Sequence, residues 1–153
     1  MKKLLPAVLF IALLVAACGP TPPSPPPSPA EQPLPEAKFP VHCFEQRLPD
    51  GSVLSFQYTE YYDDIVGILD YSFAEKDGAH GTFKGQKEGN VITAVWDYMI
   101  EGSQQQEEIM VKIEGNKAVK ASGELMEAPG GLLKLKDPAG ATWAETFDQV
   151  ACD

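Results

Sequence analysis

The chain has only two histidines and three cysteines among its 153 residues, and it lacks the short motifs that mark many enzyme sites. It contains no Gly-x-Ser-x-Gly, His-Glu-x-x-His or Cys-x-x-Cys sequence, no phosphate-binding glycine loop and no calcium loop with regular acidic spacing. We expect His42 to pack in a strand and His80 to lie in an exposed turn. The sequence therefore predicts no catalytic residue, no metal ligand and no cofactor, and we expect a protein that is not an enzyme.

Basic residues are scarce as well. From residue 38 onward the chain has ten basic and twenty acidic side chains, a formal net charge of −10. A surface of this sign repels the phosphates of nucleic acids, so we do not expect a nucleic-acid partner. The acidic groups at residues 60–64, 75–77 and 107–108 are expected to be solvated turn and edge charges, although paired carboxylates could in principle bind Ca²⁺ or act as acid and base.

A long apolar run that could cross a membrane is also missing. Residues 4–17 give 14 residues, with Pro6 near their start, whereas about 20 are needed to span a bilayer. Lys2 and Lys3 precede this run, and small residues lead from it into a cysteine. A positive start, a short apolar run and small residues are typical of an export signal.

The four residues Val15-Ala16-Ala17-Cys18 resemble the lipobox of bacterial lipoproteins. In that family the cysteine thiol takes a diacylglycerol, a dedicated peptidase cuts just before it, and the new amino terminus is acylated. The resemblance implies a signal peptide over residues 1–17 and a membrane anchor at Cys18, held permanently by several acyl chains. Gly19, where some family members have Asp, implies transfer to the outer membrane of a double-membraned cell, with the domain in the periplasm or at the cell surface.

A proline-rich segment follows the lipidated cysteine over residues 18–40. Ten of the 22 residues in 19–40 are proline. Proline fixes φ and removes a backbone donor, so this segment is expected to populate polyproline II rather than helix or sheet. We interpret it as a disordered tether, and a proline-rich recognition peptide is the alternative.

From residue 41 the composition changes to a rhythm of strands and turns. Residues 53–61 and 91–100 alternate apolar and polar side chains, which is the period of two of a half-buried strand. Residues 106–113 and 133–136 repeat the pattern. Gly, Asp and Asn, which tolerate positive φ, punctuate the runs at a spacing of about ten residues. The even positions of 91–100 are therefore expected to face a core.

This rhythm predicts an all-β domain over residues 41–153, an antiparallel meander of about eight strands. A long sheet with one apolar face must curl up or find a second layer, and no helical pattern is available to cover it. We therefore expect closure into a small barrel or barrel-like sandwich. The expected strands are 41–48, 52–61, 65–75, 80–87, 91–100, 105–114, 117–127 and 131–136, with a short closing strand in the tail 142–152.

Two cysteines remain once Cys18 is acylated. Cys43 and Cys152 stand at the two ends of the domain, and the first and last strands of a closed meander are neighbours. In an oxidising compartment we expect a disulfide between them. The alternative is two free, buried thiols.

A second resemblance covers residues 66–114. Tyr71-x-Phe73-x-Glu75-Lys76-Asp77, followed by Gly81-Thr82, Gly85, Gly89-Asn90, Ala94, Trp96, Tyr98 and Glu101-Gly102, is similar to the recurring core of small, mostly uncharacterised bacterial lipoproteins. It implies an all-β lipoprotein domain and no particular activity.

Aromatic side chains are the remaining candidates for a site, because small barrels often hold one ligand among aromatic walls. A barrel core filled by the same rings is the alternative. The candidate lining residues are Phe56, Tyr58, Tyr71, Phe73, Trp96 and Tyr98.

Three classes of function fit these observations. The favoured class is a membrane-anchored, non-enzymatic module that binds an envelope protein or a small apolar ligand. The alternative is an inhibitor of a cell-envelope hydrolase such as a lysozyme or protease. An enzyme with an unfamiliar carboxylate site is the third.

Overall fold

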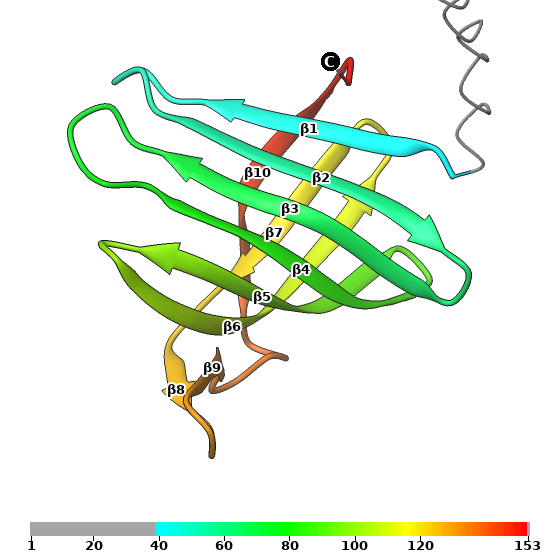
Figure 1. The fold of residues 1–153 in the computed structure, drawn as a ribbon. Coiled ribbons are helices and arrows are strands. Elements are labelled where there is room, and N and C mark those ends of the chain that lie inside the picture. Colours follow the sequence, from blue (N-terminus) through cyan, green and yellow to red (C-terminus); the bar gives the residue numbers. More distant parts are fainter. Residues whose placement is uncertain (1–38, 153) are drawn as a thin grey trace, which may run out of the picture. The chain divides into compact units, whose positions relative to one another are not determined.

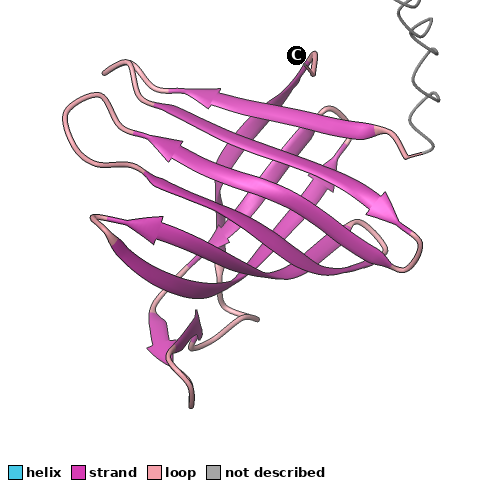
Figure 2. Ribbon diagram, in the orientation of Figure 1, coloured by secondary structure: helices cyan, strands magenta, loops and turns pink. Residues whose placement is uncertain are grey.

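The computed structural model describes residues 39–152, and the predicted signal peptide, Cys18 and most of the proline-rich segment lie outside this range. All regular structure in residues 39–152 is β-strand (Figure 2). Strands pair in the order β5-β4-β3-β2-β1-β10-β7-β6-β9-β8, and β5 also pairs with β6. Strands β1 to β7 and β10 therefore form a closed antiparallel barrel of eight strands, with β8 and β9 outside it (Figure 1). The predicted all-β barrel is confirmed.

The first six strands follow the expected runs closely. Each boundary falls at a Gly-, Asp- or Asn-containing turn, where positive φ or side-chain bonding to the backbone reverses the chain. These strands are β1 Val41–Arg47, β2 Val53–Tyr61, β3 Asp64–Ser72, β4 Ala79–Glu88, β5 Val91–Ile100 and β6 Ser103–Glu114.

The last third of the chain differs from the prediction. The single strand expected at 117–127 is two strands, β7 Lys117–Ser122 and β8 Leu125–Glu127, separated by Gly123 and Glu124. The strand expected at 131–136 is β9 Leu132–Leu135, which pairs parallel with β6 outside the barrel. The eighth barrel strand is β10 Thr142–Val150, so the tail supplies a full strand rather than a short one.

One hydrophobic core fills the barrel. The inward-facing residues of β2 and β5 are the ones that the alternation predicted: Leu54, Phe56 and Tyr58 on β2, and Ile92, Ala94, Trp96 and Tyr98 on β5, are all buried. Ile100, also expected inside, is partly buried at the core's edge. Phe56, Trp96 and Phe147 are among the largest side chains with almost no exposed surface. The interior is therefore packed with the chain's own side chains.

Glycines on the inner face of β3 and β4 make room for the largest rings. A Cβ on Gly67 would lie 2.4 Å from Cζ of Phe83, and one on Gly81 would lie 2.6 Å from Cβ of Tyr98. Glycine inside a strand usually marks such a close approach, because any side chain would force the strands apart. The two glycines thus allow aromatic rings to occupy the barrel axis.

The barrel closes where the ends of the domain meet. β1 pairs antiparallel with β10 through Cys43–Val150, Phe44–Gln149 and Glu45–Asp148. Two residues beyond this pairing, Cys152 forms a disulfide with Cys43, with their Cα atoms 5.4 Å apart. The predicted pairing of the first and last strands, and the predicted disulfide, are both present in the structure.

Candidate functional site

Four of the six candidate aromatic residues meet at one end of the barrel, where β3 and β5 end. Trp96 stacks on Tyr98 with ring centroids 3.8 Å apart and receives the edge of Tyr71 at 5.5 Å. Phe73, just past the end of β3, stacks on Tyr71. Phe56 and Tyr58 pack nearer the middle and the other end, against Phe44; Phe56 also stacks on Phe83.

These rings fill the barrel rather than surround an opening. Phe56, Tyr58, Trp96 and Tyr98 are at most 8% exposed, while Tyr71 and Phe73 are half-buried. Burial raises the pKa of the Tyr58 and Tyr98 phenols, and burial together with the nearby charge of Glu145 raises that of Tyr71 well above its usual range. All three phenols therefore stay neutral at physiological pH.

Three charged side chains also point into this end of the barrel, and the sequence pattern did not indicate this. The prediction that Glu107 is a solvated edge charge is wrong, because only 14% of its side chain is exposed. Glu107 lies opposite Trp96, Lys120 opposite Val111, and Glu145 opposite Lys120 in the strand registers. Residues directly opposite each other in an antiparallel pair share one face of the sheet. Because Trp96 and Val111 are core residues, the three charges face inward as well.

The inward charges are satisfied by one another and by Tyr71. Lys120 Nζ lies 3.4 Å from Glu107 Oε1 and 3.7 Å from Glu145 Oε2, and Tyr71 donates a 2.7 Å hydrogen bond to Glu145 Oε2. The exposed fraction of the side chain is only 11% for Lys120, 14% for Glu107 and 24% for Glu145. An unpaired charge in such a site is costly, and here each charge has a partner of opposite sign, so we interpret the network as structural.

One polar atom near this network has no partner. The indole Nε1 of Trp96 is buried and donates no hydrogen bond within the described residues. Tyr98, by contrast, donates to Gln105 Oε1 at 2.9 Å. An unpaired buried donor costs about 1–3 kcal/mol, a cost that the packing of the large indole offsets.

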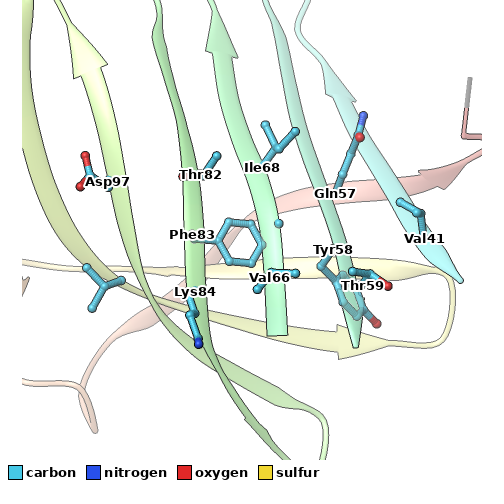
Figure 3. A pocket seen from close by; sticks show the side chains of 12 residues that line it. Val41, Gln57, Tyr58, Thr59, Val66, Ile68, Thr82, Phe83, Lys84 and Asp97 are labelled. Carbon is cyan, nitrogen blue, oxygen red and sulfur yellow. The ribbon is translucent and has the colours of Figure 1, made fainter. Parts of the chain in front are cut away.

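A second feature lies on the outside of the barrel. An open groove of about 720 Å³ crosses β1 to β5, with Val41 at one end and Asp97 at the other (Figure 3). Its apolar floor is formed by outward-facing branched side chains, namely Val41, Val66, Ile68 and Val95. Three of these are substantially exposed: Val41 by 52%, Ile68 by 42% and Val95 by 38%. Outward positions of a solvated barrel are usually polar, so this cluster is unusual.

Charged groups stand along the rim of the groove. Lys84 is paired with Asp64 at 2.7 Å. Asp97 accepts hydrogen bonds from the side-chain amides of Gln104 at 2.7 Å and Gln106 at 3.1 Å, and these donors lower its pKa. Asp97 has no cationic partner among residues 39–152. The groove therefore combines an apolar floor with a fixed, unneutralised carboxylate.

Sequence reasoning missed this groove. The alternation had assigned Val95 to the outer face but gave no reason to single it out. Val41 lies on β1, while Val66 and Ile68 lie on β3, and only the strand register brings these two strands and β5 together in one sheet. The sequence does show valine and isoleucine at outward positions of the strands. These residues are common in any β-strand, however, so their presence does not by itself indicate a binding groove.

The histidines and one acidic group considered in the sequence have local roles. His42 stacks on Tyr58, and exposed His80 lies 3.6 Å from Asp70. Near the end of β2, Glu60 pairs with Lys87. Within residues 39–152, no three His, Cys, Asp or Glu side chains are grouped so that they could hold a metal ion. The same part of the chain has no helix long and apolar enough to cross a membrane.

Comparison with known proteins adds nothing to this geometry: no family model, curated protein or solved structure matches the chain.

Proposed function

We propose that this chain is a lipid-anchored envelope protein whose barrel is a non-enzymatic binding module, and that it receives a protein partner on the groove across β1 to β5. The observation that carries the proposal is the contrast between the two faces of the sheet. The interior is filled by side chains, while the outer face keeps Val41, Ile68 and Val95 exposed around an open groove. Contiguous exposed apolar surface of this kind marks interaction sites.

A protein partner fits this groove better than a small apolar ligand does. Small-molecule pockets bury about 70–90% of their ligand. The groove spreads over five strands and is open along its length, so it would cover a small ligand on one side only. A protein segment, in contrast, brings its own second wall, and its apolar side chains can displace water from the exposed valines.

Site-specific photo-cross-linking in intact cells tests this function. A photoreactive amino acid at position 68, on the groove floor, should give an adduct of one reproducible mass. The matched control is the same amino acid at position 148, which also faces outward but on β10. The adduct should disappear when Val66→Glu introduces a charge into the groove. Equal labelling from both positions, or none at position 68, would contradict the proposal.

The anchor is tested separately, because Cys18 lies outside the described residues. In Cys18→Ser the acceptor thiol is lost, so labelled fatty acid should not be incorporated and the uncleaved precursor should persist. The control is Cys152→Ser in the same cells, which leaves the lipobox intact and should be labelled normally. A processed, lipid-labelled Cys18→Ser chain would overturn the lipoprotein assignment.

The alternative function, inhibition of a basic envelope hydrolase such as a lysozyme, is favoured by one observation, the excess of ten carboxylates in the domain. Opposite charge speeds encounter with a basic enzyme and aligns the partners. The test is enzyme activity at equimolar purified chain. Stoichiometric inhibition that Ile68→Ser weakens would make inhibition the module's role, whereas unchanged activity of basic hydrolases would exclude it.

A further inference from the structure

The outer face of β1 to β5 carries more negative than positive charge around its apolar floor. The outward-facing carboxylates of β1 to β5 are Glu45, Asp64, Asp70, Glu88 and Asp97, and the outward-facing Lys and Arg side chains are Arg47 and Lys84. Both cations are already engaged, Arg47 with Glu45 at 2.6 Å and Lys84 with Asp64 at 2.7 Å. The charge left unneutralised beside the groove is therefore negative.

Asp97 is the carboxylate best placed to meet a partner. It lines the groove, two residues along β5 from Val95 and directly opposite Thr82 on β4. The amides of Gln104 and Gln106 hold both of its oxygens from one side, so its orientation is fixed before a partner arrives. A carboxylate keeps further acceptor capacity after two such bonds, and charged acceptors form the stronger hydrogen bonds with cationic donors.

From this arrangement we propose that the groove selects a cationic amphipathic segment of a partner protein, with aliphatic side chains on Val66, Ile68 and Val95 and a Lys or Arg on Asp97. This inference rests on the proposed function and names the chemistry of the partner. Apolar contact supplies the affinity, and complementary charge supplies the choice of partner, because an acidic segment would bring like charges together. Charge complementarity over the whole domain, with a net charge of −10 from residue 38 onward, favours the same partner.

Model peptides provide the test. The purified full chain is titrated with three ten-residue peptides: alternating Lys and Leu, alternating Glu and Leu, and Lys alone. We expect the Lys/Leu peptide to bind in a 1:1 complex, the Glu/Leu peptide not to bind, and the all-Lys peptide to bind at least tenfold more weakly than the Lys/Leu peptide. Equal binding of the Lys/Leu and Glu/Leu peptides would overturn the inference.

Two variants locate the contact. Asp97→Asn should weaken Lys/Leu binding by about 1.4- to 5-fold, the range for one exposed ion pair, and this loss should shrink at 1 M salt, where the Debye length falls to about 3 Å. Ile68→Ser should weaken binding at every salt concentration. Asp148→Asn is the matched control on β10 and should change nothing. An Asp97→Asn affinity equal to that of the native chain would overturn the assignment.

The outcomes separate this inference from the proposed function. If Ile68→Ser weakens binding but neither peptide charge nor Asp97 matters, the groove is a docking site without preference for cations, and only the inference fails. If Ile68→Ser has no effect on peptide binding and position 68 gives no cross-link in cells, the groove is not a docking site and both fail.

Discussion

Two neighbouring residues on β5 show how sharply one strand divides the domain into inside and outside. Trp96 is 2% exposed and lies in the core, whereas Val95 is 38% exposed on the groove floor. Trp96→Ala removes a large ring from a close-packed interior and should cost about 3–5 kcal/mol in the free energy of unfolding, a large share of a typical 5–15. Val95→Ala should cost under about 1.5 kcal/mol. Chemical denaturation followed by circular dichroism measures both, and equal costs would reject the face assignment.

The buried phenols predict a loss of stability at alkaline pH. The pKa values of Tyr58, Tyr71 and Tyr98 are raised from 10.0 by burial, and for Tyr71 by the charge of Glu145 as well. Above pH 10 the unfolded chain releases these protons and the folded chain keeps them. Ionisation therefore favours unfolding, so the stability is full below pH 10 and falls as the pH rises beyond it.

The predicted loss of stability is tested by measuring both the absorbance at 295 nm and the melting temperature between pH 8 and 12. The tyrosinate signal of these three residues should appear only as the domain unfolds. Tyr71→Phe removes one of the three titrating groups, so its melting temperature should fall less steeply with pH than that of the native chain. Full tyrosinate absorbance in a folded domain at pH 11 would contradict the burial of the phenols.

Residue types explain why the interior charges were not predictable. The binary pattern assigns charged side chains to the outside, yet Glu107, Lys120 and Glu145 face inward because they neutralise one another. Each belongs to a different strand, so the pattern of any single strand shows only a polar residue at an apolar position. Such compensation is visible only once the strands are paired.

At the scale of strands and turns, the local sequence pattern predicted β1 to β6 correctly but not the strands that follow them. Period-two alternation and turn residues located six strands to within a few residues. The tail failed because β10 changes register at a bulge between Trp143 and Glu145, which breaks the alternation. The prediction for β9 failed for a different reason: Leu133 and Leu135 alternate as they would in a barrel strand, but β9 pairs with β6 and β8 outside the barrel.

A substitution in the turn between β5 and β6 is expected to make the domain more stable. Glu101 and Gly102 form its two-residue loop with φ of 50° and 75°, and positive φ at both positions suits Asn-Gly better than Glu-Gly. Glu101→Asn should raise the free energy of unfolding by up to about 1 kcal/mol, because a side chain other than Asn or Asp is strained there. Glu88→Asn, at an exposed strand end without positive φ, is the control. Equal shifts of the two denaturation midpoints would argue against a strained turn.

For the whole molecule, the pairing of β1 with β10 is the step that turns a curled sheet into a barrel. Only three register pairs join these strands, whereas ten join β5 to β6. The disulfide stands next to this short pairing and links residues 109 positions apart. The disulfide could be predicted from the sequence because the cysteines lie at the two ends of the domain. That it stands beside a pairing of only three residue pairs could be learned only from the strand register.

Removing the disulfide should therefore weaken the pairing of β1 with β10 more than it weakens the packing of the core. Cys152 is exposed and Cys43 is buried, so Cys152→Ser breaks the bridge without opening a cavity in the core. In the chain-entropy model a loop of about 100 residues contributes up to about 4.7 kcal/mol. The variant should unfold at a lower denaturant concentration, and backbone amides of β1 and β10 should exchange with solvent faster than those of β5 and β6. Reduction of the native chain should give the same exchange pattern.

The oxidation state of Cys43 and Cys152 is measured first, on the native chain. After denaturation and alkylation without reduction, the peptides that contain Cys43 and Cys152 should carry no label, and both should carry one after reduction. Labelled cysteines in the unreduced, exported chain would exclude the bridge. A bridge whose loss leaves both the midpoint and the β1–β10 exchange unchanged would show that three ladder pairs and the shared core close the barrel on their own.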